Sequence, residues 1–163
     1  MGFSYGGCLT AYAITRTDRF RAASINEGPA NLLGYALAVA GQPDRVEILS
    51  DQAGFGSPWH PDSERTLREQ SAIYRIDRVR TPTLLEYGIA SMAEPHGTEL
   101  FGALQRFRVP SMFIVYPRTG HGIEEPLLRE DSYRRNLAWF DYWVLGRGSN
   151  PITAPTDSIA HGR

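Results

Sequence analysis

Residues 2–7 read Gly-Phe-Ser-Tyr-Gly-Gly, which fits the pattern Gly-x-Ser-x-Gly and adds a further glycine. This stretch predicts a sharp turn between a strand and a helix, because glycines allow the strained backbone and close packing that such a turn needs. In that turn Ser4 Oγ would stand clear of the sheet. The backbone N–H of Tyr5 would point at an oxyanion, supported by the positive end of the following helix. The alternative interpretation is a glycine-rich turn with an incidental serine.

Outward from this turn, helix-like and strand-like segments alternate, which predicts an α/β fold with a parallel sheet flanked by helices. The segment 131–145 has the clearest helical period, with an apolar stripe typical of a helix that packs on a core. That stripe consists of Tyr133, Leu137, Phe140 and Val144. The expected helices are 6–15, 29–40, 62–70 (N-cap Asp62 or Ser63), 95–107 and 131–145; the expected strands are 20–25, 83–87 and 111–116, and 42–61 is an expected loop.

Composition favours one globular domain. The chain has 163 residues, of which 42% are hydrophobic and 21% charged, and this size suits a single core. Its 17 Lys and Arg residues balance 18 Asp and Glu residues, which argues against a nucleic-acid partner. No apolar stretch approaches the roughly 20 residues that cross a bilayer, so no membrane partner is expected.

Cofactor and metal chemistry are not expected either. Cys8 is the only cysteine, which excludes an intrachain disulfide and a cysteine-based zinc site. The sequence contains no phosphate-binding glycine loop, dinucleotide fingerprint or metal-ligand cluster. No signal peptide follows Met1, so a cytoplasmic location is slightly favoured, although a targeting region would lie in the segment that we expect to be missing.

A second chemical signal is His121, which is flanked by glycines and follows the expected strand 111–116 after a short loop. A histidine after a late strand is where an α/β-hydrolase places its general base. The order serine before histidine is also the order of that fold, whereas chymotrypsin-like and subtilisin-like enzymes place the serine last. The other histidines, which lie in loops or near the C-terminus, are expected to be solvated: His60, His96 and His161.

Five segments together carry a family resemblance: residues 1–7, 18–23, 54–59, 80–85 and 116–122. They resemble the C-terminal half of the catalytic domain in the prolyl oligopeptidase family of serine peptidases, in particular its acylaminoacyl-peptidase and dipeptidyl-peptidase-like members. The resemblance covers residues 1–145 and leaves 146–163 as a flexible C-terminal tail. It implies a peptidase that cleaves peptide substrates through an acyl-enzyme, with Ser4 as nucleophile, His121 as general base and the Tyr5 N–H in the oxyanion hole.

The third member of the triad departs from the family pattern. The family carries an aspartate in a Gly-x-x-Asp loop, whereas residues 88–91 here read Gly-Ile-Ala-Ser. Ser91 cannot supply the negative charge that stabilises an imidazolium, and loss of that carboxylate costs about 10⁴ in kcat in the best-studied serine protease. Glu94, the nearest acid in the same loop, is the expected substitute. Other acids near the site are equally compatible with solvated or salt-bridged roles: Glu86, Glu124 and Glu125.

Asn26 and Glu27 follow the end of an expected strand, on the side of the sheet where α/β sites form. We expect this pair to belong to a capped and solvated loop, and substrate contact is the alternative interpretation.

The resemblance further predicts a partial α/β-hydrolase fold whose N-terminal strands, second oxyanion donor and β-propeller are missing. An open sheet edge would favour association, so a complementary N-terminal segment or a second copy of the chain is an expected partner. Two alternatives to a peptidase remain: an esterase with the same serine turn, and a catalytically weak or inactive truncated hydrolase that acts as a binding or assembly module.

Overall fold

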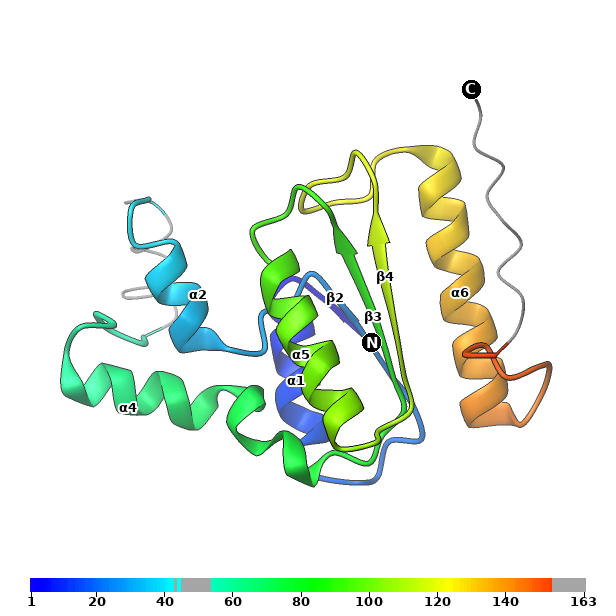
Figure 1. Ribbon diagram of the computed structural model, residues 1–163, viewed down its shortest axis with the longest axis horizontal. Coiled ribbons are helices and arrows are strands. Elements are labelled where there is room, and N and C mark those ends of the chain that lie inside the picture. Colours follow the sequence, from blue (N-terminus) through cyan, green and yellow to red (C-terminus); the bar gives the residue numbers. More distant parts are fainter. Residues whose placement is uncertain (43, 45–53, 154–163) are drawn as a thin grey trace.

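The computed structural model describes residues 1–42, 44 and 54–153, and its centre is a four-stranded parallel sheet (Figure 1). The spatial order of the strands follows their order in the chain, and each strand pairs in parallel with the next. All six residues of the third strand are buried, as expected for a parallel strand that is covered on both faces. The strands are β1 (Gly2–Phe3), β2 (Ala23–Asn26), β3 (Thr83–Gly88) and β4 (Ser111–Tyr116).

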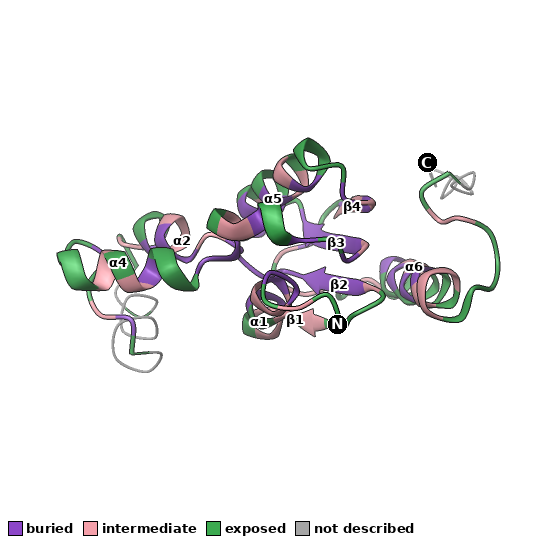
Figure 2. Ribbon diagram, turned by 90° about the horizontal axis from the view of Figure 1, so that it is seen from below, coloured by how far each residue is buried: buried purple, intermediate pink, exposed green. Residues whose placement is uncertain are grey.

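Helices cover both faces of the sheet, so the predicted fold class is confirmed. In Figure 2, α1 and α5 lie on one side of the strands and α6 on the other, while α2 and α4 lie farther out beyond α1 and α5. The helices are α1 (Tyr5–Ile14), α2 (Leu32–Ala38), α4 (Pro61–Gln70), the 3₁₀ helix η2 (Ala72–Arg78), α5 (Glu94–Arg106) and α6 (Pro126–Leu145). None of the described helices is both long and apolar enough to cross a bilayer.

The main hydrophobic core lies between the sheet and the layer formed by α1, α5 and η2. Buried Ile25 and Leu85 on the strands pack with Leu100 and Leu104 of α5 and with Ile14 of α1. Leu100 and Leu104 are four residues apart, so they lie on the same face of α5. This face packs against the strands. The core therefore packs the C-terminal half of α1 against the sheet.

Several expected boundaries differ from the structure. The second strand begins at Ala23 and not at Phe20, whose side chain is largely exposed, and α2 is shorter than the expected segment 29–40. The N-cap of α4 is His60, whose Nδ1 accepts a hydrogen bond from the Asp62 N–H at 3.3 Å, so the predicted cap at Asp62 or Ser63 is wrong. Part of the expected loop 42–61 (43 and 45–53) and most of the expected tail (154–163) lie outside the described residues.

The expected apolar stripe of α6 is also wrong. Tyr133 and Leu137 are 63% and 66% exposed, and the helix instead turns Ser132 and Asn136 toward the sheet. The reason is a carboxylate on β3: Glu86 is buried, and it accepts hydrogen bonds from Ser132 Oγ at 3.1 Å and Asn136 Nδ2 at 2.6 Å. A buried carboxylate needs donors, and this need outweighs the burial of two apolar side chains.

Candidate active site

Ser4 stands in a strained turn between β1 and α1. Its backbone has φ 57° and ψ −123°, a conformation that costs a residue with a side chain about 1–3 kcal/mol. The turn is held because the Ser4 N–H donates to the Asn26 carbonyl at 2.8 Å. A Cβ at Gly2 would lie 2.0 Å from the carbonyl oxygen of Gly6, so only glycine fits there. The serine turn predicted from residues 2–7 is therefore present.

The start of α1 leaves backbone donors free beside Ser4. The Ser4 side chain makes no capping hydrogen bond to the helix, so its Oγ is available for another partner. The N–H of Tyr5 belongs to the first turn of α1, where backbone amides have no acceptor within the helix. This N–H and the positive helix end can stabilise an oxyanion that forms next to Ser4 Oγ.

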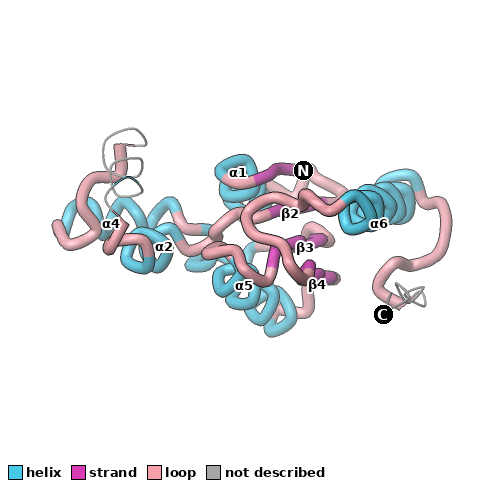
Figure 3. Tube along the Cα trace, turned by 90° about the horizontal axis from the view of Figure 1, so that it is seen from above, coloured by secondary structure: helices cyan, strands magenta, loops and turns pink. Residues whose placement is uncertain are grey.

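The loops after β3 and β4 gather at the carboxyl ends of the strands (Figure 3). There His121 meets Ser4. Its Nε2 lies 2.9 Å from Ser4 Oγ, and its ring packs 5.0 Å from the ring of Phe3 between centroids. The imidazole is 48% exposed, so a substrate can reach it. A hydrogen bond of 3.0 Å from the Ala90 N–H to the Thr119 carbonyl ties together the loops after β3 and β4.

The acid next to His121 is Glu27, not Glu94. Glu27 follows β2, its Oε2 lies 3.3 Å from His121 Nδ1, and its side chain is only 5% exposed. The carboxylate of Glu94 instead accepts a hydrogen bond from Thr98 Oγ1 within α5 at 2.7 Å. The expectation of a solvated Glu27 is thus wrong, and the expected contact between Glu94 and His121 is not found among the described residues.

Two of the other three acids named from the sequence are engaged elsewhere, and the third, Glu124, is exposed. Glu86 is occupied by α6, and Glu125 pairs with Arg118 at 2.8 Å. One sequence signal could have pointed to Glu27: it comes directly after a buried strand, and parallel strands end at the same edge of a sheet.

A close crossing of two backbones places the Glu27 segment against the first turn of α1. A Cβ at Gly28 would lie 2.4 Å from the carbonyl carbon of Gly7, and a Cβ at Gly7 would lie 2.8 Å from Gly28 Cα. Glycine at both positions lets the loop after β2 run directly over the helix that follows Ser4. The distance between the serine turn and the Glu27 carboxylate is therefore set by backbone contact.

A cavity of about 290 Å³ opens beside Ser4 and His121. Its wall is mainly apolar and includes Pro29, Leu32 and Met92. The remaining lining residues are Tyr5, Cys8, Glu27, Tyr35, Ala90, Ser91 and Ala93. An apolar side chain of a bound substrate could occupy this cavity, with its carbonyl carbon next to Ser4 Oγ.

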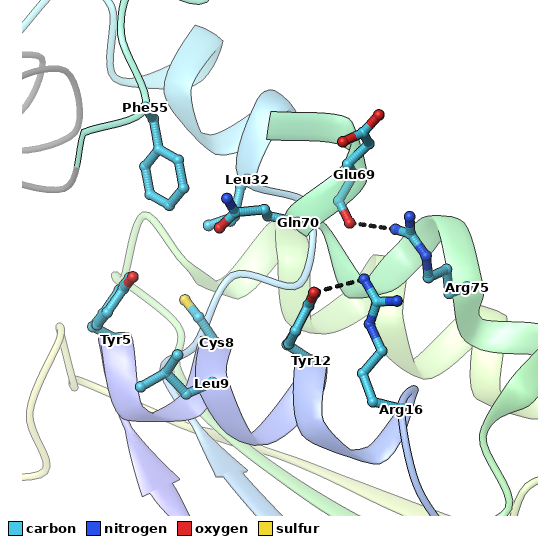
Figure 4. Close-up of a pocket in the computed structure, with 10 residues that line it drawn as sticks. All are labelled: Tyr5, Cys8, Leu9, Tyr12, Arg16, Leu32, Phe55, Glu69, Gln70 and Arg75. Atoms are coloured by element: carbon cyan, nitrogen blue, oxygen red, sulfur yellow. Dashed lines mark hydrogen bonds between the residues drawn. The ribbon is translucent and has the colours of Figure 1, made fainter. Parts of the chain in front are cut away.

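A second cavity of about 400 Å³ lies between α1 and the α4–η2 segment (Figure 4). Tyr5, Cys8 and Leu32 line both cavities, so these residues form the partition between them. At its far end, Arg16 donates to the Tyr12 hydroxyl at 2.6 Å. Burial raises the pKa of the Cys8 thiol to about 12, so this thiol is protonated at neutral pH.

Glu86 forms a separate buried network behind the site. Burial raises the pKa of its carboxyl above the ordinary value, and hydrogen bonds and the charge of Arg135 oppose that rise. The Tyr116 hydroxyl lies 2.9 Å from Glu86 Oε1 and 3.0 Å from Asp131 Oδ2. A hydroxyl has one proton, so both contacts are hydrogen bonds only if one carboxyl is protonated. Burial, which raises the pKa of the Glu86 carboxyl, favours its protonated form.

No group of three or more His, Cys, Asp or Glu side chains among the described residues is arranged to hold a metal ion. The groups that meet at the site are a hydroxyl, an imidazole, a carboxylate and backbone N–H donors.

The parallel sheet, the strained serine turn and the following helix are those of an α/β-hydrolase. The prolyl oligopeptidase family matches residues 1–147, and the chain belongs to this family.

Relatives match over only part of their own length. The chain is 27% identical to the acylamino-acid-releasing enzyme of Mus musculus over 145 residues, which is 85% of this chain and 19% of that enzyme. It is 30% identical to the lasso peptide isopeptidase AtxE2 of Asticcacaulis excentricus over 176 residues, which is 99% of this chain and 22% of the isopeptidase. The chain thus spans about a fifth of the length of these relatives.

Solved structures give the same picture. A puromycin-hydrolyzing peptidase of Mycobacterium tuberculosis superposes with a TM-score of 0.75 at 27% identity, covering 87% of this chain and 21% of that one. An acylaminoacyl peptidase of Pyrococcus horikoshii reaches a TM-score of 0.76 at 19% identity, covering 93% of this chain and 25% of that one. At 19% identity, the likeness to the Pyrococcus horikoshii structure shows a shared fold.

Proposed function

We propose that this chain carries the nucleophile and the general base of a serine peptidase that cleaves peptide bonds through an acyl-enzyme. The observation that supports the proposal most directly is the 2.9 Å contact between Ser4 Oγ and His121 Nε2, formed by a serine in a strained turn. A serine that only happened to lie in a glycine-rich turn would not be expected to contact a histidine 117 residues away in the chain. The family's peptidases support the same reaction class.

In the proposed mechanism, Ser4 Oγ attacks the carbonyl carbon of the scissile bond while His121 Nε2 accepts the hydroxyl proton. The tetrahedral oxyanion accepts a hydrogen bond from the Tyr5 N–H at the start of α1. His121 then donates its proton to the leaving amine, and the acyl group stays on Ser4. Water, activated by the same imidazole, releases the acid product and restores the serine.

The substrate that we propose is a peptide with an apolar side chain next to the scissile carbonyl. The support is the cavity of about 290 Å³ beside Ser4, whose wall includes Pro29, Leu32 and Met92. An aliphatic or aromatic side chain that is transferred from water to this wall gains about 1.5–3 kcal/mol. Such a gain discriminates against charged side chains at that position.

We also propose that full activity requires a longer or assembled form of the protein. In the part of the chain that the structure describes, β1 pairs on one edge only, with β2, and Met1 and Phe3 are exposed beside it. An open edge of this kind pairs readily with another segment. The expected partner is a complementary segment that completes the sheet, and a second copy of the chain is the other candidate.

An activity-based probe tests the proposed function. A fluorophosphonate reacts with a serine hydroxyl only where a neighbouring base activates it, so we expect labelling of Ser4 in the folded protein and none after Ser4→Ala. Labelling that is equal in both proteins, or absent from the folded wild type, would refute the proposal. Failure to label would leave the truncated hydrolase that acts as a binding module as the better account.

A pair of substrates separates a peptidase from an esterase with the same serine turn. Aminoacyl 4-nitroanilides carry the amide bond of a peptide, whereas 4-nitrophenyl esters have a better leaving group. We expect turnover of both, with the anilide preferring an apolar acyl residue. Turnover of the ester alone would favour the esterase.

A further inference from the structure

We propose that Glu27, from the end of β2, is the carboxylate that positions His121, and that Ser91, from the loop after β3, holds Glu27 in place. This inference rests on the proposed function and names the third member of its triad. The family resemblance predicted an acid in the loop after β3, and Glu94 was the expected substitute there. The proposal moves this role to the end of the neighbouring strand β2. Glu27 acts through His121 and does not touch the reacting atoms, so it is a positioning residue.

The contacts of the Glu27 carboxylate fit this role. Oε2 faces His121 Nδ1 at 3.3 Å, on the side of the ring opposite the Nε2 that meets Ser4. A carboxylate at Nδ1 keeps the proton on that nitrogen and leaves Nε2 free to accept the serine proton. It also stabilises the imidazolium that forms during attack.

The rest of the carboxylate is fully paired with neutral donors. Oε1 accepts a hydrogen bond from the Gly88 N–H at 2.5 Å, and Oε2 accepts one from Ser91 Oγ. A buried acid is found mainly where partners satisfy it, and here none of the partners neutralises the charge. No arginine or lysine among these partners neutralises the Glu27 carboxylate, so its negative charge faces His121.

The backbone of Glu27 is held as tightly as its side chain. Its φ is 57°, a value that a residue with a Cβ adopts only under constraint, and its N–H donates to the Glu86 carbonyl at 3.1 Å. The preceding residue, Asn26, accepts the hydrogen bond from the Ser4 N–H. Nucleophile and acid thus share one backbone anchor, which fixes the distance that His121 must bridge.

Ser91 has the chemistry that this arrangement requires. Its hydroxyl donates to Glu27 and accepts from the Ala93 N–H at 3.1 Å. An aspartate at this position would face Glu27 with a second negative charge, and two carboxylates that share one site cannot both ionise readily. Serine places a donor there in place of a second charge.

No other described acid competes for His121. The charged residues nearest to it in the chain are Arg118, Glu124 and Glu125. Arg118 and Glu125 pair with each other at 2.8 Å, and Glu124 is exposed. Glu94 is bound to Thr98 on α5, and Glu86 faces α6 on the other side of the sheet. In the described part of the chain, the only ion pair of His121 is with Glu27.

Three glutamate-to-glutamine variants test the assignment: Glu27→Gln, Glu94→Gln for the competing acid, and Glu130→Gln on the exposed face of α6 as the matched control. The first readouts are kcat and the rate of fluorophosphonate labelling. We expect Glu27→Gln to lower kcat by about 10²–10⁴ with little change in KM, because Glu27 acts on the reacting atoms only through His121. Glu130→Gln should leave both rates unchanged.

Two further readouts separate positioning from a purely structural role. Without its negative neighbour the imidazolium is less stable, so the acidic limb of the kcat/KM profile should move to lower pH in Glu27→Gln. The NMR titration of the His121 ring should shift in the same direction. The double variant Glu27→Gln, Ser91→Asp returns a carboxylate to the same spot from the other loop, and we expect it to recover at least about tenfold of the lost kcat.

These outcomes distinguish the two proposals. An active wild type with unchanged kcat and His121 titration in Glu27→Gln would overturn the assignment and leave the peptidase intact. An inactive wild type whose His121 titration shifts in Glu27→Gln would overturn the peptidase and leave the Glu27–His121 pair. If Glu27→Gln does not fold, the folded double variant decides: activity well above the background of Ser4→Ala supports the assignment, and activity at that background refutes it.

Discussion

Replacing Ser4 with glycine should abolish activity, as Ser4→Ala does, but should leave the protein more stable than Ser4→Ala. The serine backbone has φ 57° and ψ −123°, a combination that glycine reaches without a steric penalty. The matched control is Ser4→Ala, which also removes the hydroxyl but keeps a Cβ in the strained turn. Both variants lose the hydrogen bond between Oγ and His121 Nε2, so their difference isolates the backbone strain.

The size of the effect follows from two opposing terms. A residue with a Cβ in such a conformation costs about 1–3 kcal/mol, and glycine removes that cost. Glycine adds about 0.5–1 kcal/mol of conformational entropy to the unfolded chain, which acts against it. The net expectation is that Ser4→Gly is more stable than Ser4→Ala by about 0.5–2 kcal/mol.

Urea unfolding of the three proteins, followed by circular dichroism, measures this difference. We expect midpoints in the order Ser4→Gly above Ser4→Ala, with equal m values, and no fluorophosphonate labelling of either variant. If Ser4→Ala proved as stable as Ser4→Gly or more so, the turn would store no strain and the account of its geometry would be wrong.

Three further changes probe the surroundings of the site. Gly28→Ala should lower the free energy of unfolding by about 1–3 kcal/mol and slow Ser4 labelling, because its Cβ would lie 2.4 Å from the backbone of α1. Urea unfolding measures the first effect, with Gly102→Ala as the control because a Cβ there meets nothing within 4 Å. The Cys8 thiol, with a pKa raised to about 12, should resist iodoacetamide at pH 8 in the folded protein and react on unfolding, as mass spectrometry would record; fast reaction of the folded protein would contradict its burial. The pKa of Glu86 is raised in the folded state. Its contribution to stability is therefore complete below the pKa of the unfolded state and is lost as pH rises through the pKa of the folded state. Glu86→Gln should flatten this decline of the unfolding free energy with pH, and an unchanged slope would contradict the raised pKa of Glu86.

The sequence predicted the framework of the fold because local patterns set it. The apolar run at residues 111–116 is β4 with the same bounds, and the glycine pattern around Ser4 gave the turn before α1. The exposed face of α6 was mispredicted because helical periodicity counts apolar residues and does not register a carboxylate on another element. Glu86 on β3 decided which face turned inward.

The pairing of Ser4 with His121 was within reach of the sequence, whereas the acid was not. The positions of serine and histidine follow from their own loops and from the order of the strands. The choice among five nearby acids depends on which loop ends nearest to the imidazole, and that depends on the crossing of Gly7 and Gly28. No sequence pattern within either segment encodes this contact.

A carboxylate can move between loops in this architecture because parallel strands deliver their following residues to one edge of the sheet. Asn26 and Glu86 are register partners on β2 and β3, so the loops after these strands begin side by side and both can reach the ring that follows β4. What must be preserved is the position of a negative charge at His121 Nδ1, and not the loop that carries it. The two solutions differ in their backbone requirements, since the β2 route needs a positive φ at Glu27 and glycine at both Gly7 and Gly28. The position of the acid is therefore tied to the serine turn itself, and a substitution at either glycine should disturb nucleophile and carboxylate together.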